Sequence, residues 1–288
     1  MMHKPVFTAL DLPEYSWLKI INPSAILRNV RHALFDFDGT ISLIRRGWET
    51  IMIPMMVEMI CGEYGPSPEI ISEVEDYVDR STGILTIKQM QWLVQTVEHY
   101  GYVQQPLTAH AYKKLYNERL LLPVKQRIKQ MDGSQSARDQ LMVSGARIFL
   151  QALQDQGIKL YLASGTDHEY VIEEARILGV SDYFESHIYG ARDDTPAYTK
   201  ERIIQDIIQT NDLRGEQLMV VGDGPVEIQH AKANGALALG VAADESKRQG
   251  FNIKKVQRLK DAGADLIIAG FERHKELLDL LCFTDAQP

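Results

Sequence analysis

The stretch Arg31-His32-Ala33-Leu34-Phe35-Asp36-Phe37-Asp38-Gly39-Thr40 decides the fold of this chain. Its apolar run 33–35 is short and closes with an Asp-Gly turn signal, which is typical of a buried strand. The period-2 geometry of an extended chain places Asp36 and Asp38 on the same side. Two acids at the end of a buried strand are costly unless something neutralises them, and a hard cation such as Mg²⁺ would do so. A solvated Asp-Gly turn is the alternative interpretation.

Length and composition indicate an ordinary globular protein. The 288 residues can hold one large domain or a core domain with an insert. The chain is 45% hydrophobic and 24% charged, as is usual for a soluble protein. Its 31 Lys and Arg against 39 Asp and Glu give a net charge of −8. This balance argues against nucleic acid as the main partner, although a local basic pocket for a small anion stays possible.

Cysteine usage and hydropathy indicate a cytoplasmic protein without a membrane partner. Cys61 and Cys282 lie far apart in the sequence with no nearby Cys/His pattern, so we expect two reduced thiols rather than a disulfide or a zinc site. Asp11 and Glu14 interrupt the N-terminal region, so no signal peptide is expected there. The longest apolar stretch, 51–60, is too short for a bilayer, which needs about 20 apolar residues.

The sequence divides into three parts. Residues 1–30 are expected to form an extension that packs on the body of the protein. Residues 47–134 show helical periodicity and no convincing strand, so we expect a helical domain there. Residues 31–46 and 135–288 are expected to form an α/β core that this helical domain interrupts.

From about residue 144 the pattern alternates between helices and strands, which predicts a doubly wound parallel sheet with helices on both faces. In such sheets ligands bind beyond the carboxyl ends of the strands, at the topological switch point. The expected strands are 158–163, 187–189, 218–221, 236–241 and 266–268, and the expected helices are 144–156, 168–178, 199–209, one opened by 222–225 and running to about 234, and 273–281.

A second group of reactive residues follows the strand 158–163. Ser164 and Gly165 lie between a strand end and a helix start, where a hydroxyl and free N–H groups can hold an anion, so we predict that they bind phosphate. Thr166 or Asp167 is expected to cap the following helix instead.

A third group follows the strand 218–221. Asp223 is expected to share a cation with Asp36, because both follow strands of the same sheet. Glu227 can support that ion directly or through water, or it can stabilise a helix N-terminus. Lys200 begins another helix, where the helix dipole opposes a cation, so we expect it to balance the carboxylates and a phosphate.

In this order, the residues Asp36-Phe37-Asp38-Gly39-Thr40, Ser164, Lys200 and Gly222-Asp223-Gly224 with Glu227 resemble the four motifs of the haloacid dehalogenase-like (HAD) hydrolase superfamily. The resemblance runs from about residue 32 to the end of the chain. It implies a Rossmann-like core, and the helical insert resembles a C1-type cap. Many members have Asp where this chain has Glu227, which leaves the direct metal contact of Glu227 open.

The resemblance also implies a mechanism. Asp36 would attack a phosphorus atom to give an aspartyl-phosphate, and Asp38 would act as general acid and base. Mg²⁺ would lie between Asp36, the backbone carbonyl of Asp38, and Asp223. Ser164 and Lys200 would hold the oxygens of the transferring phosphoryl group.

Three functions compete on this basis. The first is a Mg²⁺-dependent phosphatase for a small phosphorylated metabolite, such as a sugar phosphate, phosphoglycolate or a nucleoside monophosphate. The second is a phosphomutase of the β-phosphoglucomutase type, and the third is a non-enzymatic binding protein on the same fold. The presence of Asp38 favours phosphate-ester chemistry over dehalogenation. The metabolite and the oligomeric state stay open.

The cap is expected to choose the substrate. Candidate substrate contacts are Trp48 and the arginines Arg45 and Arg46 at the entry to the insert, with Lys88 inside it and Arg192 in a later loop. The two arginines could bind a second anionic group, or they could be solvated linker charges.

Overall fold

The computed structural model describes residues 15–192 and 199–282. Its core is a seven-stranded sheet in the order β1-β7-β6-β5-β2-β3-β4. All pairs are parallel except β1 with β7, so the predicted α/β fold is confirmed, with one antiparallel edge strand added. The strands are β1 (Leu18–Ile20), β2 (His32–Phe35), β3 (Lys159–Asp167), β4 (Ile188–Ala191), β5 (Leu218–Gly222), β6 (Leu237–Val241) and β7 (Leu266–Ile268).

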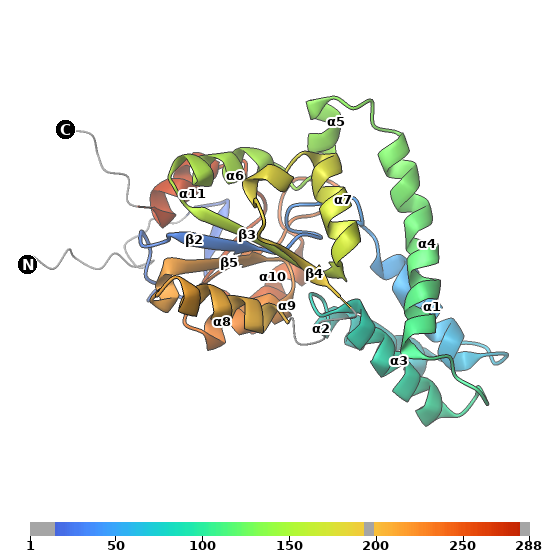
Figure 1. Cartoon of the computed structure of the whole chain (residues 1–288). Helices are drawn as coiled ribbons and strands as arrows, with labels where there is room; N and C mark the ends of the chain where they lie inside the picture. Colours follow the sequence, from blue (N-terminus) through green and yellow to red (C-terminus); the bar gives the residue numbers. More distant parts are fainter. Residues whose placement is uncertain (1–14, 193–198, 283–288) are drawn as a thin grey trace, which may run out of the picture.

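Helices cover both faces of the sheet (Figure 1). In β2 the side chains of Ala33 and Phe35 enter one hydrophobic cluster and Leu34 enters the other, because successive residues of a strand point to opposite faces. Both faces are therefore apolar, as in other sheets covered on two sides. The first cluster includes residues of α6 (Ala146–Asp155), α7 (His168–Leu178) and α11 (His274–Leu281), and the second includes residues of α8 (Lys200–Thr210), α9 (Pro225–Ala233) and α10 (Ile253–Asp261).

The insert after β2 is helical and stands beside the core (Figure 1). Two of its helices begin at side-chain caps, since Ser67 and Thr108 accept hydrogen bonds from the backbone N–H groups of Ile70 and Ala111. The insert contains α1 (Glu49–Cys61), α2 (Pro68–Arg80), α3 (Thr86–Tyr100) and α4 (Ala109–Lys129), and the short α5 (Gln135–Gln140) leads back to the core.

Two elements differ from the sequence-based expectation. The N-terminal region contributes β1, which pairs with β7 in the register Leu18 to Ile268, instead of only packing on the body. Helix α10 was not predicted, although Asn252 caps it and Leu259 is buried on its inner face. The two cysteines, Cys61 and Cys282, are buried and form no disulfide, as the sequence predicts.

The order of the strands places β2 at the topological switch point. Its neighbours are β3, which follows it after the cap, and β5, which comes later in the chain. The carboxyl ends of these three parallel strands therefore meet at one edge of the sheet. Across the described ranges, the structure contains no helix that is long and apolar enough to cross a membrane.

Candidate active site

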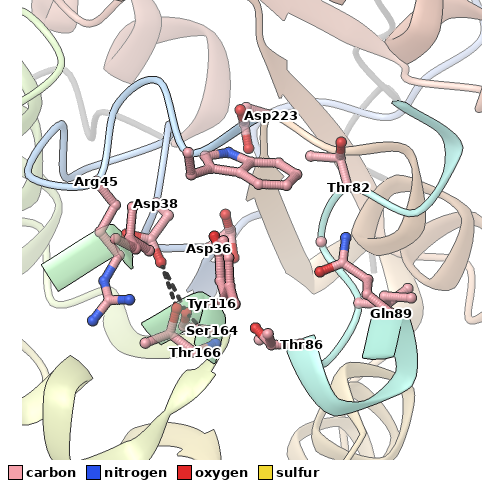
Figure 2. A pocket seen from close by; sticks show the side chains of 15 residues that line it. Asp36, Asp38, Arg45, Thr82, Thr86, Gln89, Tyr116, Ser164, Thr166 and Asp223 are labelled. Atoms are coloured by element: carbon pink, nitrogen blue, oxygen red, sulfur yellow. Dashed lines mark hydrogen bonds between the residues drawn. The ribbon is translucent and has the colours of Figure 1, made fainter. Parts of the chain in front are cut away.

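The strand ends bring the predicted acids together. Asp36 directly follows β2 and is held against β5, because its backbone N–H donates to the Val221 carbonyl at 2.8 Å. Asp223 directly follows β5. One pocket is lined by both of these residues and by Asp38 and Ser164 (Figure 2). The residue groups that the sequence places at three separate strand ends thus lie at one site.

The Asp36 carboxylate is buried beside a lysine. Lys200 Nζ lies 2.6 Å from Asp36 Oδ1 and 3.2 Å from Glu227 Oε2. Burial raises the pKa of the Asp36 carboxyl well above its usual range, and the charge of Lys200 opposes that rise. Lys200 stays protonated, because its two acidic neighbours raise its pKa despite burial. The ammonium group therefore holds Asp36 in one position and favours its ionised form.

Asp38 has a different environment. Its Oδ2 accepts hydrogen bonds from Thr166 Oγ1 at 3.0 Å and from Ser164 Oγ at 3.3 Å. Its Oδ1 is buried and has no hydrogen-bond partner among the described residues. Burial raises the pKa of the Asp38 carboxyl, against the charge of Arg45 and the two hydroxyl groups. A carboxyl group with a raised pKa and a free oxygen is suited to give and take a proton.

Three buried acids could hold a divalent cation. One carboxylate oxygen from each of Asp36, Asp223 and Glu227 lies within 4.8 Å of the others. Carboxylate oxygens are the ligands that Mg²⁺ prefers, so the residues fit such an ion. Gly39 has φ +75°, and a Cβ at this position would collide with Asp223 Oδ2. The glycine thus lets the chain after β2 approach the Asp223 carboxylate.

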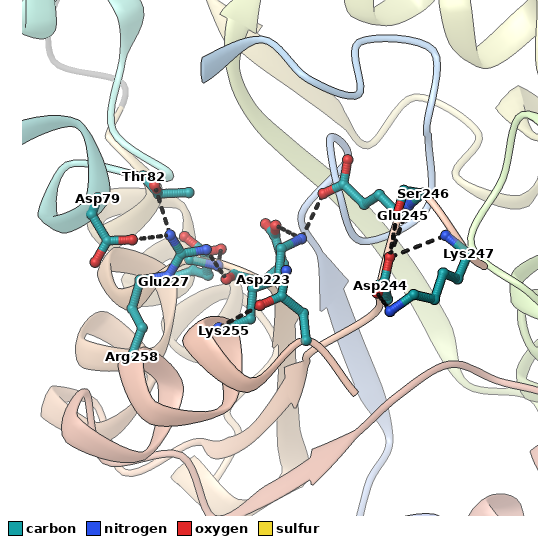
Figure 3. Close-up of polar contacts among 12 residues, drawn as sticks. Asp79, Thr82, Asp223, Glu227, Asp244, Glu245, Ser246, Lys247, Lys255 and Arg258 are labelled. Atoms are coloured by element: carbon teal, nitrogen blue, oxygen red, sulfur yellow. Dashed lines mark hydrogen bonds and ion pairs between the residues drawn. The ribbon is translucent and has the colours of Figure 1, made fainter. Parts of the chain in front are cut away.

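Two basic residues of α10 contact Asp223 (Figure 3). Lys255 Nζ lies 2.6 Å from Asp223 Oδ2 and 2.6 Å from Glu245 Oε1. Arg258 donates from Nη2 to the Asp223 carbonyl at 3.0 Å, and from Nη1 to Asp79 Oδ1 at 2.8 Å in the cap. Helix α10 therefore holds Asp223 in position and links it to the cap domain.

The cap closes over the pocket through the segment between α2 and α3. Gly165 at the end of β3 lies against this segment, since a Cβ at this position would collide with the Ile84 carbonyl. The cap contributes Thr82, Thr86 and Gln89 on one side of the pocket, opposite Asp38 and Ser164 (Figure 2). The remaining lining residues from the cap and its linker are Trp48, Gly83, Ile84, Tyr116 and Leu120.

The residues predicted to contact substrate do not all reach this pocket. Trp48 and Arg45 line it. Arg46 lines a separate depression with Arg127, and Arg192 lines another beside α7, where its Nη2 lies 2.6 Å from His168 Nε2. The remaining candidate, Lys88, is exposed and does not line the pocket.

Arg45 is neither solvated nor free. Its Nε and Nη2 lie 3.0 and 2.7 Å from Glu174 Oε1 on α7, and both side chains are buried. Burial raises the pKa of the Glu174 carboxyl to about 7, and the arginine opposes that rise. Of the two alternatives for Arg45, a solvated linker charge is therefore wrong.

The prediction that Thr166 or Asp167 caps the N-terminus of α7 is also wrong. Asp167 precedes this helix without a side-chain cap bond, and it pairs instead with Lys113 and Asn117 of the cap domain. Thr166 binds Asp38 rather than capping the helix. A local sequence signal describes a possible cap, but tertiary neighbours compete for the same oxygen atoms.

Sequence reasoning missed Lys255 and Arg258 because it missed α10. A signal was available, since Asn252 is followed by apolar residues at 253, 256 and 259 and by Gly263. An N-cap, helical spacing and a terminal glycine together predict a helix. The partners of its basic residues, in contrast, lie about 30 residues away for Asp223 and about 180 for Asp79.

Comparison with known proteins gives the family. The model of the haloacid dehalogenase-like hydrolases matches residues 30–235. The chain belongs to this family. It is 25% identical over 210 residues, 72% of this chain and 80% of the relative, to a 5′-nucleotidase of Pseudomonas aeruginosa.

Solved structures share the fold. A predicted phosphoglycolate phosphatase from Haemophilus somnus matches with a TM-score of 0.58 and 16% identity, over 86% of this chain and 98% of that one. A β-phosphoglucomutase from Clostridium difficile matches with a TM-score of 0.53 and 14% identity, over 87% and 99%.

Proposed function

We propose that this protein is a Mg²⁺-dependent phosphatase that hydrolyses a small phosphorylated metabolite through a phosphorylated Asp36. One observation carries the proposal: two carboxylates two residues apart have different partners at one pocket. Asp36 lies against an ammonium group at 2.6 Å, whereas Asp38 accepts only hydroxyl groups among the described residues. Environments that separate two carboxyl groups in this way suit a nucleophile and an acid–base catalyst.

In the first step an oxygen of Asp36 forms a bond to the phosphorus of the ester. The bond from phosphorus to the leaving oxygen breaks, and Asp38 donates its proton to that oxygen, which departs as an alcohol. Ser164 and Gly165 line the pocket and would bind the phosphoryl oxygens, and Lys200, which is hydrogen-bonded to Asp36 Oδ1, would keep that carboxylate in place.

In the second step Asp38, now a carboxylate, takes a proton from a water molecule that attacks the same phosphorus. The bond between phosphorus and Asp36 breaks, so inorganic phosphate leaves and the Asp36 carboxylate is restored. Mg²⁺ held by Asp36, Asp223 and Glu227, with the Asp38 carbonyl, would supply positive charge to the phosphoryl group. The closed cap limits the access of other water molecules.

A screen for phosphate release over sugar phosphates, short phosphorylated acids and alcohols, and nucleotides tests the proposal. We expect release from at least one ester by the wild-type chain with Mg²⁺ and none by Asp36→Asn. Isomerisation of a sugar phosphate without release of phosphate would indicate a phosphomutase instead. Equal rates for the wild type and Asp36→Asn would exclude the proposed nucleophile.

A further inference from the structure

We propose that the leaving group of the substrate is small, uncharged and hydroxylated, as in the phosphate ester of a short polyol. This inference rests on the proposed phosphatase function and adds the class of substrate. It follows from the charge, the chemistry and the size of the pocket.

The pocket offers no available cation for a second anionic group, as far as the described residues show. Arg45 is the one cationic side chain among those that line it, and Glu174 neutralises it through a two-point contact. The Arg45 guanidinium also lies 5.2 Å from the centre of the Tyr170 ring, which further restricts it. A buried ion pair of this kind is costly to open, because each charge would lose its partner.

The other lining charges are negative. Asp36, Asp38 and Asp223 line the part of the pocket where the phosphoryl group would bind under the proposed function. Lys200 and Lys255 are buried and bound to acids, and neither lines the pocket. A carboxylate or second phosphate on the leaving group would therefore meet acids without a free cation, and like charges at short range disfavour binding.

The cap side of the pocket is suited to hydroxyl groups. Thr86 and Gln89 present a hydroxyl and an amide, which can donate to and accept from an alcohol. Gln89 Nε2 donates to Ser81 Oγ at 3.1 Å, so the amide is oriented. Trp48 and Tyr116 add aromatic walls against which the C–H groups of a polyol can pack.

The pocket is small in its closed form. Its volume is about 70 Å³, which corresponds to roughly five to seven water positions at about 10–15 Å³ each. Sites for drug-sized ligands have about 300–1,000 Å³. The size of the closed pocket thus favours a short leaving group over one as large as a nucleoside.

Two phosphate esters with the same carbon skeleton test the inference. Glycerol 3-phosphate releases the neutral alcohol glycerol, and 3-phosphoglycerate has a carboxylate in place of one CH₂OH group and releases glycerate. We expect kcat/KM with Mg²⁺ to favour glycerol 3-phosphate by at least about tenfold, because the carboxylate meets like charges. An equal or higher kcat/KM for 3-phosphoglycerate would overturn the inference while leaving the phosphatase function intact. Absence of phosphate release from both esters and from the whole screen would overturn both.

A charge introduced on the cap gives a second test. Gln89→Lys places a cation at the pocket, and the matched control Gln91→Lys places one on the exposed side of the same helix. We expect Gln89→Lys to lower the preference for glycerol 3-phosphate by about tenfold and Gln91→Lys to leave it unchanged. Thermal melting confirms that each variant is folded, and Thr86→Lys replaces Gln89→Lys if the latter is not. An unchanged preference in a folded variant would refute the assignment.

Nucleotides test the size limit. We expect a nucleoside 5′-monophosphate to have a kcat/KM at least about tenfold below that of glycerol 3-phosphate, since the closed cap cannot hold the base. A higher kcat/KM for the nucleotide would overturn the size argument and would agree with the name of the Pseudomonas aeruginosa relative.

Discussion

The two sides of the pocket differ in chemistry. The side built by the strand ends is acidic, and two of its acids are paired with lysines, Asp36 with Lys200 and Asp223 with Lys255, each at 2.6 Å. The side built by the cap is uncharged, with Thr86 and Gln89 beside aromatic rings. Buried charges need partners at defined distances, so the core side tolerates little variation. Neutral side chains need no charged partner, so the residues on the cap side can differ from one substrate specificity to another.

One arginine connects the two sides. Arg258 reaches Asp79 and Thr82 in the cap and the Asp223 carbonyl in the core. We therefore expect the reaction rate to depend on the core side of the pocket, the choice of substrate on the cap side, and the coupling between the two sides on α10. The following changes test this division.

The largest effect is expected for Asp36→Asn. The amide cannot attack phosphorus as the carboxylate does, so kcat should fall on the order of 10⁴-fold or more. The variant should remain folded, because the amide keeps the shape of the side chain. Phosphate release and thermal melting measure the two properties. Asp76→Asn, at an exposed position of α2, is the control, and a near wild-type rate for Asp36→Asn would contradict the division.

Among the other single substitutions, Lys200→Met should have a large effect, with kcat/KM lower by on the order of 10²-fold. The ammonium group opposes the rise in the pKa of Asp36 that burial causes, so its loss raises that pKa further. The nucleophile must be ionised, and the acidic limb of the profile of kcat/KM against pH should therefore move to higher pH. Lys254→Met, at an exposed position of α10, should not move it. An unmoved limb in Lys200→Met would show that Lys200 does not control Asp36.

Removal of the metal should abolish the activity of the enzyme without changing its fold. We expect EDTA to abolish phosphate release and Mg²⁺ to restore it. Mg²⁺ at a hundredfold excess over Kd should also stabilise the folded state by about 2.7 kcal/mol, seen as a higher Tm. Asp223→Asn should lose most of that shift, because it removes one of the three clustered carboxylates. Activity that persists in EDTA would exclude the metal from the mechanism.

The smallest effect is expected for Arg258→Gln. Its contact with Asp79 is partly exposed, and such ion pairs contribute about 0.2–1 kcal/mol, so kcat/KM should fall by no more than about fivefold. The loss should appear for glycerol 3-phosphate and 3-phosphoglycerate alike, since the link between cap and core contacts neither leaving group. Lys260→Gln on the same helix is exposed and should have no effect. A changed preference between the two esters would place Arg258 in substrate selection.

Much of the fold was predictable from local patterns. The apolar run before Asp36, the alternation of helices and strands, and the glycine after α7 follow from periodicity and turn chemistry, which depend on near neighbours. Strand β1 was missed because its three residues carry little pattern of their own and are ordered by pairing with β7. Helix α10 was missed although its local signals were present.

The candidate site was predictable in part. That Asp36, Ser164 and Asp223 meet could be expected, since parallel strands bring their carboxyl ends to one edge. The ion pair of Arg45 could not be predicted, because its partner Glu174 lies 129 positions away in the sequence. The hydrogen bond from Thr166 to Asp38 could not be predicted either, because the local sequence does not distinguish it from a helix cap made by the same hydroxyl group.

The sequence by itself thus determined the class of protein and the residues with the chemistry, because reactive side chains at strand ends leave a readable local pattern. Only the tertiary structure decided which charges are already paired, how small the closed pocket is, and which helix joins cap and core. These properties depend on contacts between distant segments, and such contacts form when the apolar faces of the sheet and helices are buried together. The division between a charged core side and a neutral cap side belongs to this second kind of information.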